Sequence, residues 1–352
     1  MKELGYNSKI SELIGENIDH AELARVIAEH KERYIIQNDE GIFNAEITGN
    51  MRFSARSRTD LPAVGDWVRL TKMDEQNAII LERYPRYSVL ERKAVGKTGE
   101  LQIIGANIDY AFIVMAVGRD FNLNRMERYL VTCRNGNIDP IVLLTKTDLV
   151  TELEKEELQS LISKRAPGVP VLAVSNETGQ GYDALQDALK PYKTFCFIGS
   201  SGVGKSTVIN RLRKSESILT GTISASTGKG KHTTTHRELM VLPNKSIVID
   251  TPGMRELGMT NQEGGLELTY YQIAELAENC RFNDCSHENE KGCAVIGAVE
   301  AGTLSEEIYS NYLKMKREQE HFASTVHEKR QKGKEFGKMV KAVVKERKKN
   351  KF

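Results

Sequence analysis

The stretch GSSGVGKS, from Gly199 to Ser206, matches the pattern G-x-x-x-x-G-K-[S/T] of a phosphate-binding loop. The apolar run KTFCFI (residues 193–198) predicts a buried strand before the loop, and STVINRLR predicts a helix after it. This context suits the motif because backbone N–H groups and a helix N-terminus must point at the phosphates. We therefore expect Lys205 to reach the β- and γ-phosphates of a nucleotide and the Ser206 hydroxyl to bind Mg²⁺.

Strand-like and helix-like segments alternate on the N-terminal side of this loop. In order they are YAFIVMAVG, LNRMERYLVTCRN, PIVLLTK, TELEKEELQSLISKR, VPVLAVS and YDALQDALK, and the strands RELMVLP and KSIVID follow the loop. Such alternation predicts a multidomain α/β protein with a mainly parallel sheet that helices cover on both faces.

Two motifs at the ends of predicted strands indicate which base is bound. In TKTD the carboxylate of Asp148 can accept hydrogen bonds from N1–H and N2–H₂ of guanine, a donor pair that adenine lacks. In SNETG, backbone N–H groups can reach guanine O6. The predicted GTP-binding residues are Thr145, Lys146, Thr147, Asp148, Ser175, Asn176, Gly199, Ser200, Ser201, Gly202, Val203, Gly204, Lys205, Ser206, Thr207 and Gly253.

Two further stretches can complete the site around the γ-phosphate. In DTPG, Asp250 can hold Mg²⁺ through water and the Gly253 N–H can meet the γ-phosphate. The stretch GKGKHTTTH (residues 228–236) can supply a threonine to the Mg²⁺ shell. Met254 follows Gly253 at the position where many nucleotide hydrolases carry a water-orienting Gln, and a Met side chain cannot take that role.

Three of the five cysteines gather in the pattern C-x4-C-x-H-x5-C, formed by Cys280, Cys285, His287 and Cys293. Three thiolates and one imidazole make a closed tetrahedral set, which predicts one structural Zn²⁺. The alternative is a set of free thiols, which leaves the polar loop between them with little to order it. The other two, Cys133 and Cys196, are predicted to be buried packing thiols.

Short β-rich runs precede the α/β segment. RYIIQND, GIFNAEITGN, DWVRLTKMD and NAIILERYP predict a small β-barrel resembling an OB-fold, whereas SELIGENI and HAELARVIAEH before them predict helices. The glycine-containing stretch over residues 91–107 is interpreted as a hinge after the barrel.

The long connection inside the barrel carries basic and aromatic residues, namely Arg52, Phe53, Arg56 and Arg58, with Trp67 further on. Such a combination can bind looped or single-stranded RNA through phosphate contacts and base stacking. The alternative is a solvated loop in which Trp67 anchors the core, and for Trp67 we favour that alternative.

Charge is distributed unevenly along the 352 residues. Residues 326–352 hold eleven Lys or Arg against three Asp or Glu, so this tail carries +8 and the rest of the +2 chain carries −6. A basic tail suggests a polyanionic partner, although it can also be a solvated tail with none. No apolar run has the length of a membrane helix, and the N-terminus lacks the apolar core of a signal peptide, so we expect a cytoplasmic protein without a membrane partner.

The order of these motifs resembles that of a circularly permuted GTPase, because both base motifs precede the phosphate-binding loop instead of following it. With the β-rich segment before and the cysteine cluster after, residues from about Arg33 to about Thr303 resemble the ribosome small-subunit-dependent GTPase A family. The resemblance implies an OB-fold, a permuted GTPase domain and a zinc-binding helical domain. It also implies a role in late maturation of the small (30S) ribosomal subunit, with GTP hydrolysis stimulated by that subunit.

The resemblance further assigns individual residues. It points to His232 as the catalytic residue that positions water, and to Thr234 as a Mg²⁺ ligand beside Ser206 and Asp250. The chain departs from the usual N-K-x-D base motif at Thr145, which takes the place of Asn, and we expect weaker base binding from this change. The basic tail is a second departure.

These inferences divide the chain into an N-terminal helical extension (1–30), an OB-like barrel (31–92), a permuted GTPase domain (93–262), a zinc-binding helical domain (263–325) and a basic tail (326–352). We expect a monomer that binds GTP or GDP and the small subunit with its rRNA. The segment after DTPG leads to the zinc-binding domain within about thirty residues, so we expect γ-phosphate loss to be transmitted along it. Two other functions stay open: a small-molecule kinase, which the base motifs disfavour, and an RNA-binding protein that uses GTP only as a structural ligand.

Overall fold

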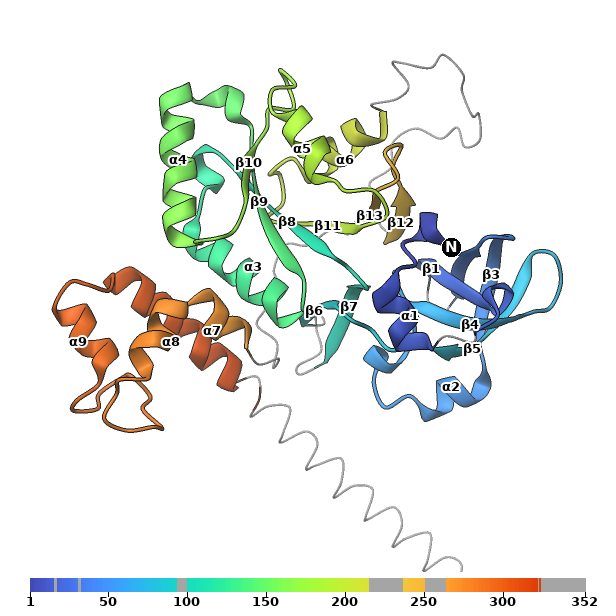
Figure 1. Ribbon diagram of the computed structural model, residues 1–352, viewed down its shortest axis with the longest axis horizontal. Coiled ribbons are helices and arrows are strands. Elements are labelled where there is room, and N and C mark those ends of the chain that lie inside the picture. The colour runs from blue at the N-terminus through green and yellow to red at the C-terminus, as the bar shows by residue number, and fades with distance from the viewer. Residues whose placement is uncertain are drawn as a thin grey trace, which may run out of the picture.

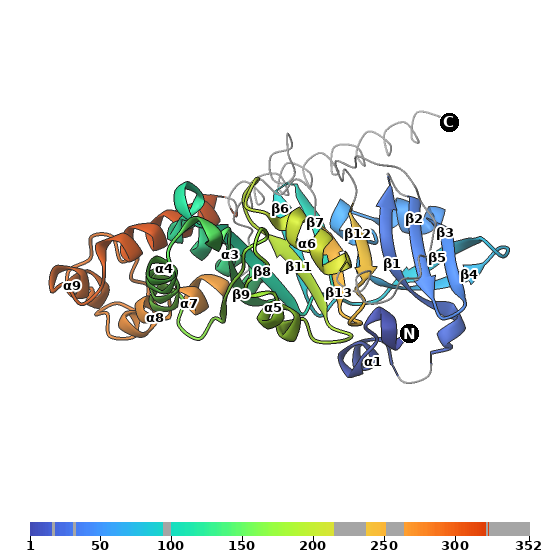
Figure 2. The ribbon, with the colours of Figure 1, turned by 90° about the horizontal axis from the view of Figure 1, so that it is seen from above.

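The computed structural model describes residues 1–15, 18–30, 33–93, 100–214, 237–250, 264–321 and 323. Three parts follow one another along the molecule: a β-barrel, a central α/β domain and a helical C-terminal domain (Figure 1). The barrel and the helical domain lie at opposite ends of the α/β domain (Figure 2).

The barrel contains five strands in the order β1-β2-β3-β5-β4, and β1 closes on β4. Neighbouring strands are antiparallel except for the parallel pair β3 and β5. This arrangement confirms the predicted OB-like barrel. Its strands are β1 (Leu23–His30), β2 (Arg33–Asn38), β3 (Gly41–Ile47), β4 (Trp67–Lys72) and β5 (Asn77–Arg83), and the short helix α2 (Gly49–Ser54) follows β3.

The prediction of a helix over residues 23–30 is wrong, because these residues form β1. The N-terminal helices are the 3-10 turns Lys2–Leu4 and His20–Glu22 and α1 (Ser8–Ile14). Leu23, Val26 and Ile27 fall at helical spacing, but two of them are β-branched, and pairing of β1 with β2 and β4 overrides the periodicity. Trp67 is 1% exposed and lies under the N-terminal segment, which confirms its role as a core anchor.

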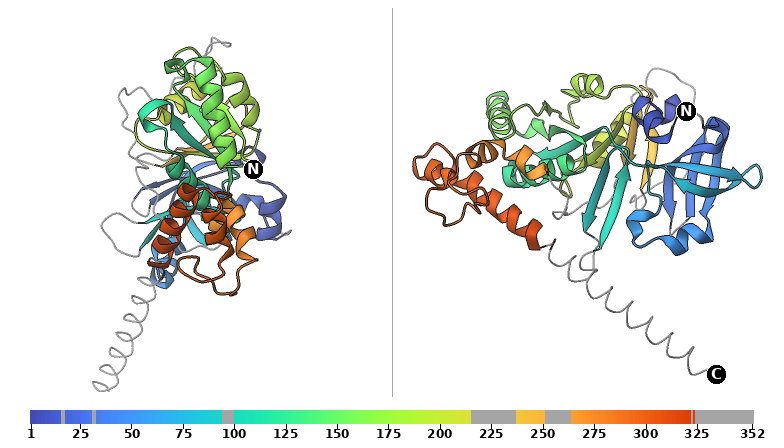
Figure 3. Two further views of the ribbon diagram at one scale, coloured as in Figure 1. Left: turned by 90° about the vertical axis from the view of Figure 1, so that its left-hand side faces the viewer. Right: turned by 60° about the horizontal axis from the view of Figure 1, so that its bottom comes forward.

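The interpretation of residues 91–107 as a hinge is also wrong. Strands β6 (Val89–Lys93) and β7 (Leu101–Ala106) pair antiparallel, and these two teal strands project beside the main sheet (Figure 3, right). Leu90 and Ile104 are buried in the same core as the central sheet. Within the described residues of this stretch, β7 is therefore packed on the core of the central domain and is not a free hinge.

The central sheet has the order β10-β9-β8-β11-β13-β12, parallel apart from β12, as predicted. Side chains alternate along β8: Ile113 and Met115 face α3 and α4, whereas Phe112 and Val114 face α5 and α6. The strands are β8 (Tyr110–Ala116), β9 (Asp139–Thr145), β10 (Val171–Ala173), β11 (Thr194–Ile198), β12 (Glu238–Val241) and β13 (Ile247–Asp250). The helices are α3 (Leu123–Asn135), α4 (Glu152–Arg165), α5 (Tyr182–Ala188) and α6 (Lys205–Lys214).

The barrel and the central sheet are continuous. Strand β1 pairs with β12 at Ala28 and Glu238, which gives one sheet of eleven strands. The buried guanidinium of Arg25 donates to the carbonyl oxygens of Leu4, Gly65 and Asn107 at 2.6–3.1 Å, so it joins the N-terminal segment, the barrel and the central domain.

The C-terminal domain contains α7 (Gly265–Thr269), α8 (Tyr271–Ala277) and α9 (Ala294–Glu300), and residues 306–321 are also helical. Its core includes Val131 of α3, so it packs on the central domain through that helix. Within the described ranges, no helix has both the length and the hydropathy needed to cross a membrane.

Candidate nucleotide and metal sites

The phosphate-binding loop joins the end of β11 to the start of α6, as the motif requires. Gly199 and Gly204 have φ angles of 149° and 95°. A Cβ atom at Gly199 would lie 2.4 Å from the carbonyl oxygen of Val114, and one at Gly204 would lie 2.9 Å from Asn176 Nδ2. Both positions therefore need glycine for conformation, and Gly199 needs it for space as well because the atom it approaches belongs to the backbone.

The Lys205 ammonium donates to the carbonyl oxygens of Gly199 and Ser200, at 2.8 and 2.5 Å. Burial lowers the pKa of Lys205, and the nearby charge of Asp250 opposes that shift. The loop thus holds a half-buried cation within reach of its own backbone. A phosphate that enters the loop would compete with these carbonyl oxygens for the Lys205 protons. The Asp250 carboxylate at the end of β13 is close enough to interact electrostatically with Lys205.

Thr145 connects the base motif to this loop. Its side chain is fully buried, and its Oγ1 lies 2.6 Å from the Val203 carbonyl oxygen and 3.1 Å from that of Met115. Since a hydroxyl has one proton, the shorter contact is the stronger donor interaction. The Thr at this position therefore still ties the base motif to the phosphate-binding loop.

Asp148 and Ser175 come from the two base motifs and meet directly. Ser175 Oγ donates to Asp148 Oδ1 at 2.6 Å and accepts from the N–H groups of Glu177 and Thr178. Asp148 is otherwise exposed, whereas Ser175 is buried. A fixed carboxylate with a free face is the arrangement that reading the guanine N1–H and N2–H₂ edge requires.

Two arginines that sequence reasoning missed also contact the site. Arg211 of α6 donates to the Asn176 carbonyl oxygen at 2.6 Å and lies over the Tyr182 ring, 4.5 Å from its centroid. Arg125 of α3 donates to Ser200 Oγ at 2.7 Å. Lone arginines on helices give no local motif, so only the tertiary packing reveals them.

The described residues thus bring the two base motifs, the phosphate-binding loop and Asp250 to one edge of the sheet. Lys146 there has a φ of 59° at the turn after β9, and Ser206 lies in the first turn of α6. His232, Thr234, Gly253 and Met254 lie outside the described residues, so their predicted roles stay predictions. The path from DTPG to the C-terminal domain lies outside them as well.

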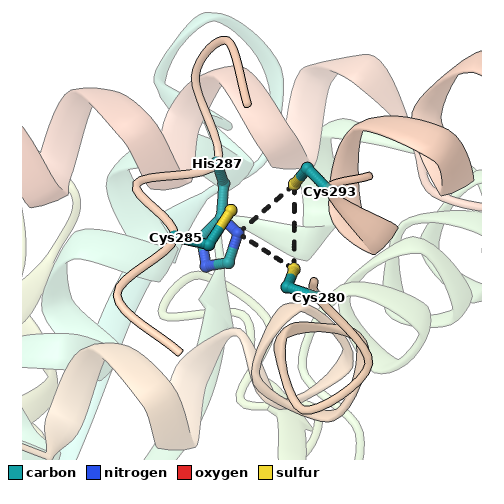
Figure 4. Close-up of side chains that lie close together, drawn as sticks. All are labelled: Cys280, Cys285, His287 and Cys293. Carbon is teal, nitrogen blue, oxygen red and sulfur yellow. Dashed lines mark hydrogen bonds between the residues drawn. The ribbon is translucent and has the colours of Figure 1, made fainter. Parts of the chain in front are cut away.

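The predicted metal-binding side chains converge (Figure 4). One ligand atom from each of Cys280, Cys285, His287 and Cys293 lies within 4.8 Å of all the others. His287 Nδ1 is 3.6 Å from Cys280 Sγ and 3.5 Å from Cys293 Sγ, and those two sulfurs are 3.8 Å apart. The group could therefore hold a metal ion. Cys133 and Cys196 are buried elsewhere, as predicted.

The surrounding fold fixes this cluster. Cys293 caps α9, since its Sγ accepts from the Ile296 N–H at 3.4 Å. The Tyr309 hydroxyl donates to the carbonyl oxygen of His287 at 2.5 Å. Hydrogen bonds from Ser286 hold the pKa of Glu290 down to about 2, so a carboxylate stabilises the loop between the ligands.

Comparison with known proteins agrees with this geometry. Residues 83–260 match the family model of the RsgA GTPase. "Small ribosomal subunit biogenesis GTPase RsgA 2" of Lactiplantibacillus plantarum is 44% identical over 296 residues, which cover 84% of this chain and 83% of that protein. The protein of the same description from Vibrio parahaemolyticus is 37% identical over 350 residues, covering 99% of this chain and 94% of its own.

Solved structures show the same architecture. YjeQ from Thermotoga maritima aligns with a TM-score of 0.63 at 26% identity, over 85% of this chain and 98% of its own. YloQ, described as a circularly permuted GTPase, aligns with a TM-score of 0.61 over 87% and 98% of the two chains, and its 24% identity bears on the fold alone. On the family model, the extent of the similarity to its members and the order of the nucleotide motifs, this chain belongs to the RsgA family of circularly permuted GTPases.

Proposed function

We propose that this protein hydrolyses GTP to GDP and phosphate and acts in late maturation of the small ribosomal subunit, which it binds through RNA and which stimulates its hydrolysis. The observation that carries the proposal is the contact between Asp148 and Ser175, because it assembles a guanine-reading carboxylate beside a phosphate-binding loop. Relatives that match most of this chain are named small ribosomal subunit biogenesis GTPases.

Guanine selection rests on Asp148. Replacing it by Asn exchanges an acceptor for an amide that presents N–H groups to the guanine donors, so Asp148→Asn should weaken GTP binding by at least about tenfold. The matched control is Asp187→Asn, at an exposed position near the C-terminal end of α5. Unchanged GTP affinity in Asp148→Asn would remove guanine reading from this residue.

Mg²⁺ is assigned to Ser206, Thr234 and Asp250, and water positioning to His232. The Ser206 and Asp250 backbones lie at the start of α6 and the end of β13, on the same edge of the sheet. An imidazole can orient water or accept its proton at neutral pH. His232→Ala should therefore lose stimulated turnover while it keeps nucleotide binding, and unchanged turnover would favour a protein that uses GTP only as a structural ligand.

The metal is assigned as Zn²⁺. Zinc bonds of about 2.3 Å to sulfur and about 2.0 Å to nitrogen, in a tetrahedron, imply separations of about 3.8 Å between sulfurs and about 3.5 Å between sulfur and nitrogen. Among Cys280, His287 and Cys293 the distances are 3.8 Å for the sulfur pair and 3.5 and 3.6 Å for the sulfur–nitrogen pairs, and the Cys285 ligand atom lies within 4.8 Å of the other three. Four protein ligands leave no open position, so the ion would be structural.

RNA contact is assigned first to the barrel. Phe53 on α2 is 93% exposed and is followed by Arg56 and Arg58, a stacking surface beside cations. A separate hollow of about 570 Å³ lies along β2, β3 and the start of β5, with Arg33, Asn44 and Asn77 among its lining residues. OB-folds bind oligonucleotides on this side of the barrel.

The C-terminal domain and the tail of net charge +8 are assigned as further rRNA contacts, because a polybasic segment binds a phosphate backbone. Because small subunits mature in the cytoplasm, we propose that the protein acts there, as a monomer. A direct test is co-sedimentation of the chain with purified small subunits in the presence of a non-hydrolysable GTP analogue or of GDP. Tighter binding in the GTP form supports the proposal, whereas equal binding in both forms contradicts it.

A further inference from the structure

Helix α3 contacts the phosphate-binding loop at its start and the C-terminal domain along the rest of its length. It lies between these two parts of the molecule (Figure 1). From Arg125 to Asn135 the helix rises by about 15 Å, at 1.5 Å a residue. It is therefore a short, continuous connection between the nucleotide site and the metal domain.

The first turn of α3 contacts the phosphate-binding loop. Asn122 caps the helix by accepting from the Arg125 N–H at 2.8 Å, and the Arg125 guanidinium donates to Ser200 Oγ at 2.7 Å. A positive charge in the first turn of a helix interacts unfavourably with the helix dipole, so Arg125 does not stabilise α3 itself. Ser200 also receives the Lys205 ammonium on its carbonyl oxygen, so two cations converge on one residue of the loop.

Two residues after Arg125, Glu127 contacts the C-terminal domain. Its carboxylate is 2% exposed and accepts from the Tyr270 hydroxyl at 2.9 Å and from the Asn311 amide. The guanidinium of Arg165 on α4 completes the group by pairing with the same carboxylate. Glu127 thus fixes α4, α3 and the C-terminal domain to one another.

The last turn of α3 repeats this connection. Arg134 donates to the Leu268 carbonyl oxygen at 2.6 Å, and the Gly265 N–H donates to Asn135 Oδ1 at 2.8 Å. A Cβ atom at Gly265 would lie 2.6 Å from the carbonyl oxygen of Val131, so α7 approaches α3 closely. Close backbone packing of this kind transmits a shift of one helix to the other.

We propose that α3 couples the phosphate-binding loop to the C-terminal metal domain, and that Arg125 is a positioning residue for GTP hydrolysis because it holds Ser200 at the nucleotide end of that helix. The inference rests on the GTP hydrolysis of the proposed function but not on the identity of the RNA. When a triphosphate draws Lys205 away from the Ser200 carbonyl, the contact to Arg125 remains and passes the movement of the loop to α3.

The test compares Arg125→Met and Arg125→Lys with the full-length wild-type chain, and Arg213→Met, an exposed site at the far end of α6, serves as the control. GTP hydrolysis with small subunits gives kcat and KM. Amide hydrogen exchange with and without a non-hydrolysable GTP analogue gives the response of α7 and α8. Melting temperatures show whether each variant folds.

We expect Arg125→Met to lower kcat by about fivefold with little change in KM, the size expected for one exposed charged contact, while Arg125→Lys recovers part of the rate. Addition of the analogue should slow exchange in α7 of the wild type and of Arg213→Met but not of Arg125→Met. An unchanged kcat together with an unchanged exchange response in Arg125→Met overturns the proposal. The proposal is also overturned if the analogue leaves hydrogen exchange in α7 of the wild type unchanged, even where GTP hydrolysis is normal. Normal hydrolysis in that case would show that the coupling through α3 fails while the proposed function stands.

Discussion

The Thr145 hydroxyl and the Val203 carbonyl oxygen lie 2.6 Å apart, and both are buried in the centre of the nucleotide site. The two residues are 58 positions apart in the chain, yet this hydrogen bond joins the base motif to the phosphate-binding loop. In this family member a hydroxyl thus makes the connection between the two halves of the nucleotide site.

Thr145→Val should weaken both the fold and nucleotide binding. Valine keeps the shape but removes the donor, and a buried carbonyl without its partner costs about 1–3 kcal/mol of the free energy of unfolding. Urea unfolding and titration with a fluorescent GDP analogue measure the two effects. Thr145→Ser keeps the hydroxyl and is the control, so equal losses in the Ser and Val variants would show that the hydroxyl is not what matters.

Glu127→Ala should be strongly destabilising. The carboxylate and Arg165 form a buried pair, and removing the carboxylate leaves Arg165 with only the more distant, exposed Glu307 as a counter-charge and leaves the Tyr270 and Asn311 donors without their acceptor, which costs about 3–5 kcal/mol. The control is Glu152→Ala, whose pair with Lys155 is at the surface and should cost less than about 1 kcal/mol. Similar losses in the two variants, measured by urea unfolding, would contradict the account of α3 as a fixed connection.

Glu29 gives a pH dependence with a definite sign. Burial raises the pKa of its carboxyl above the usual 4.5, and the charges of Arg237 and Arg58 only partly oppose this. The folded protein is therefore most stable when the Glu29 carboxyl is neutral. This contribution to the free energy of unfolding is complete below the pKa of Glu29 in the unfolded chain, and it is lost as the pH rises through the pKa of Glu29 in the folded protein. Glu29→Gln should therefore melt at a higher temperature than wild type at about pH 7.5, and at the same temperature at about pH 4.

The control for that experiment is Glu46→Gln, since Glu46 is 65% exposed and pairs only loosely with Arg33, at 3.8 Å. It should change the melting temperature little at either pH. If Glu29→Gln lowered the melting temperature near neutral pH, the attraction of the Glu29 carboxylate to the charge of Arg237 would outweigh burial, and the predicted sign would be wrong.

Cys293→Ser isolates the metal from the helix cap, because serine can still cap α9 but does not replace a thiolate ligand. We expect the bound zinc to fall from one ion per chain to nearly none and the α7–α9 region to lose protection from proteolysis, since a structural metal supplies much of the folding free energy of a small domain. Asn289→Ala in the same exposed loop is the control. Full zinc content in Cys293→Ser would remove this residue from the ligand set.

The phosphate-binding loop, the base motifs and the cysteine cluster could be predicted from sequence, because each is a short segment whose spacing is imposed by one ligand. Segments that depend on tertiary pairing could not. Residues 23–30 carry a helical period, but β1 forms because it has partners on both edges and joins β12.

The arginine contacts illustrate the same limit in the site. Arg125 and Ser200 are 75 residues apart, and Glu127 and Tyr270 are 143 residues apart. The sequence predicted α3 as a helix but held no local signal for its partners. Trp67, by contrast, is favoured in the sequence as a core anchor, and it is buried.

Hydrolysis of GTP that depends on the small ribosomal subunit is tested most directly by measuring phosphate release by the pure protein, alone and with purified small subunits. We predict slow turnover alone and a rise of at least about tenfold with the subunits, well within what a partner can add in this reaction class. The rise should be absent in His232→Ala and with large subunits. An equal rate with and without small subunits would contradict the account.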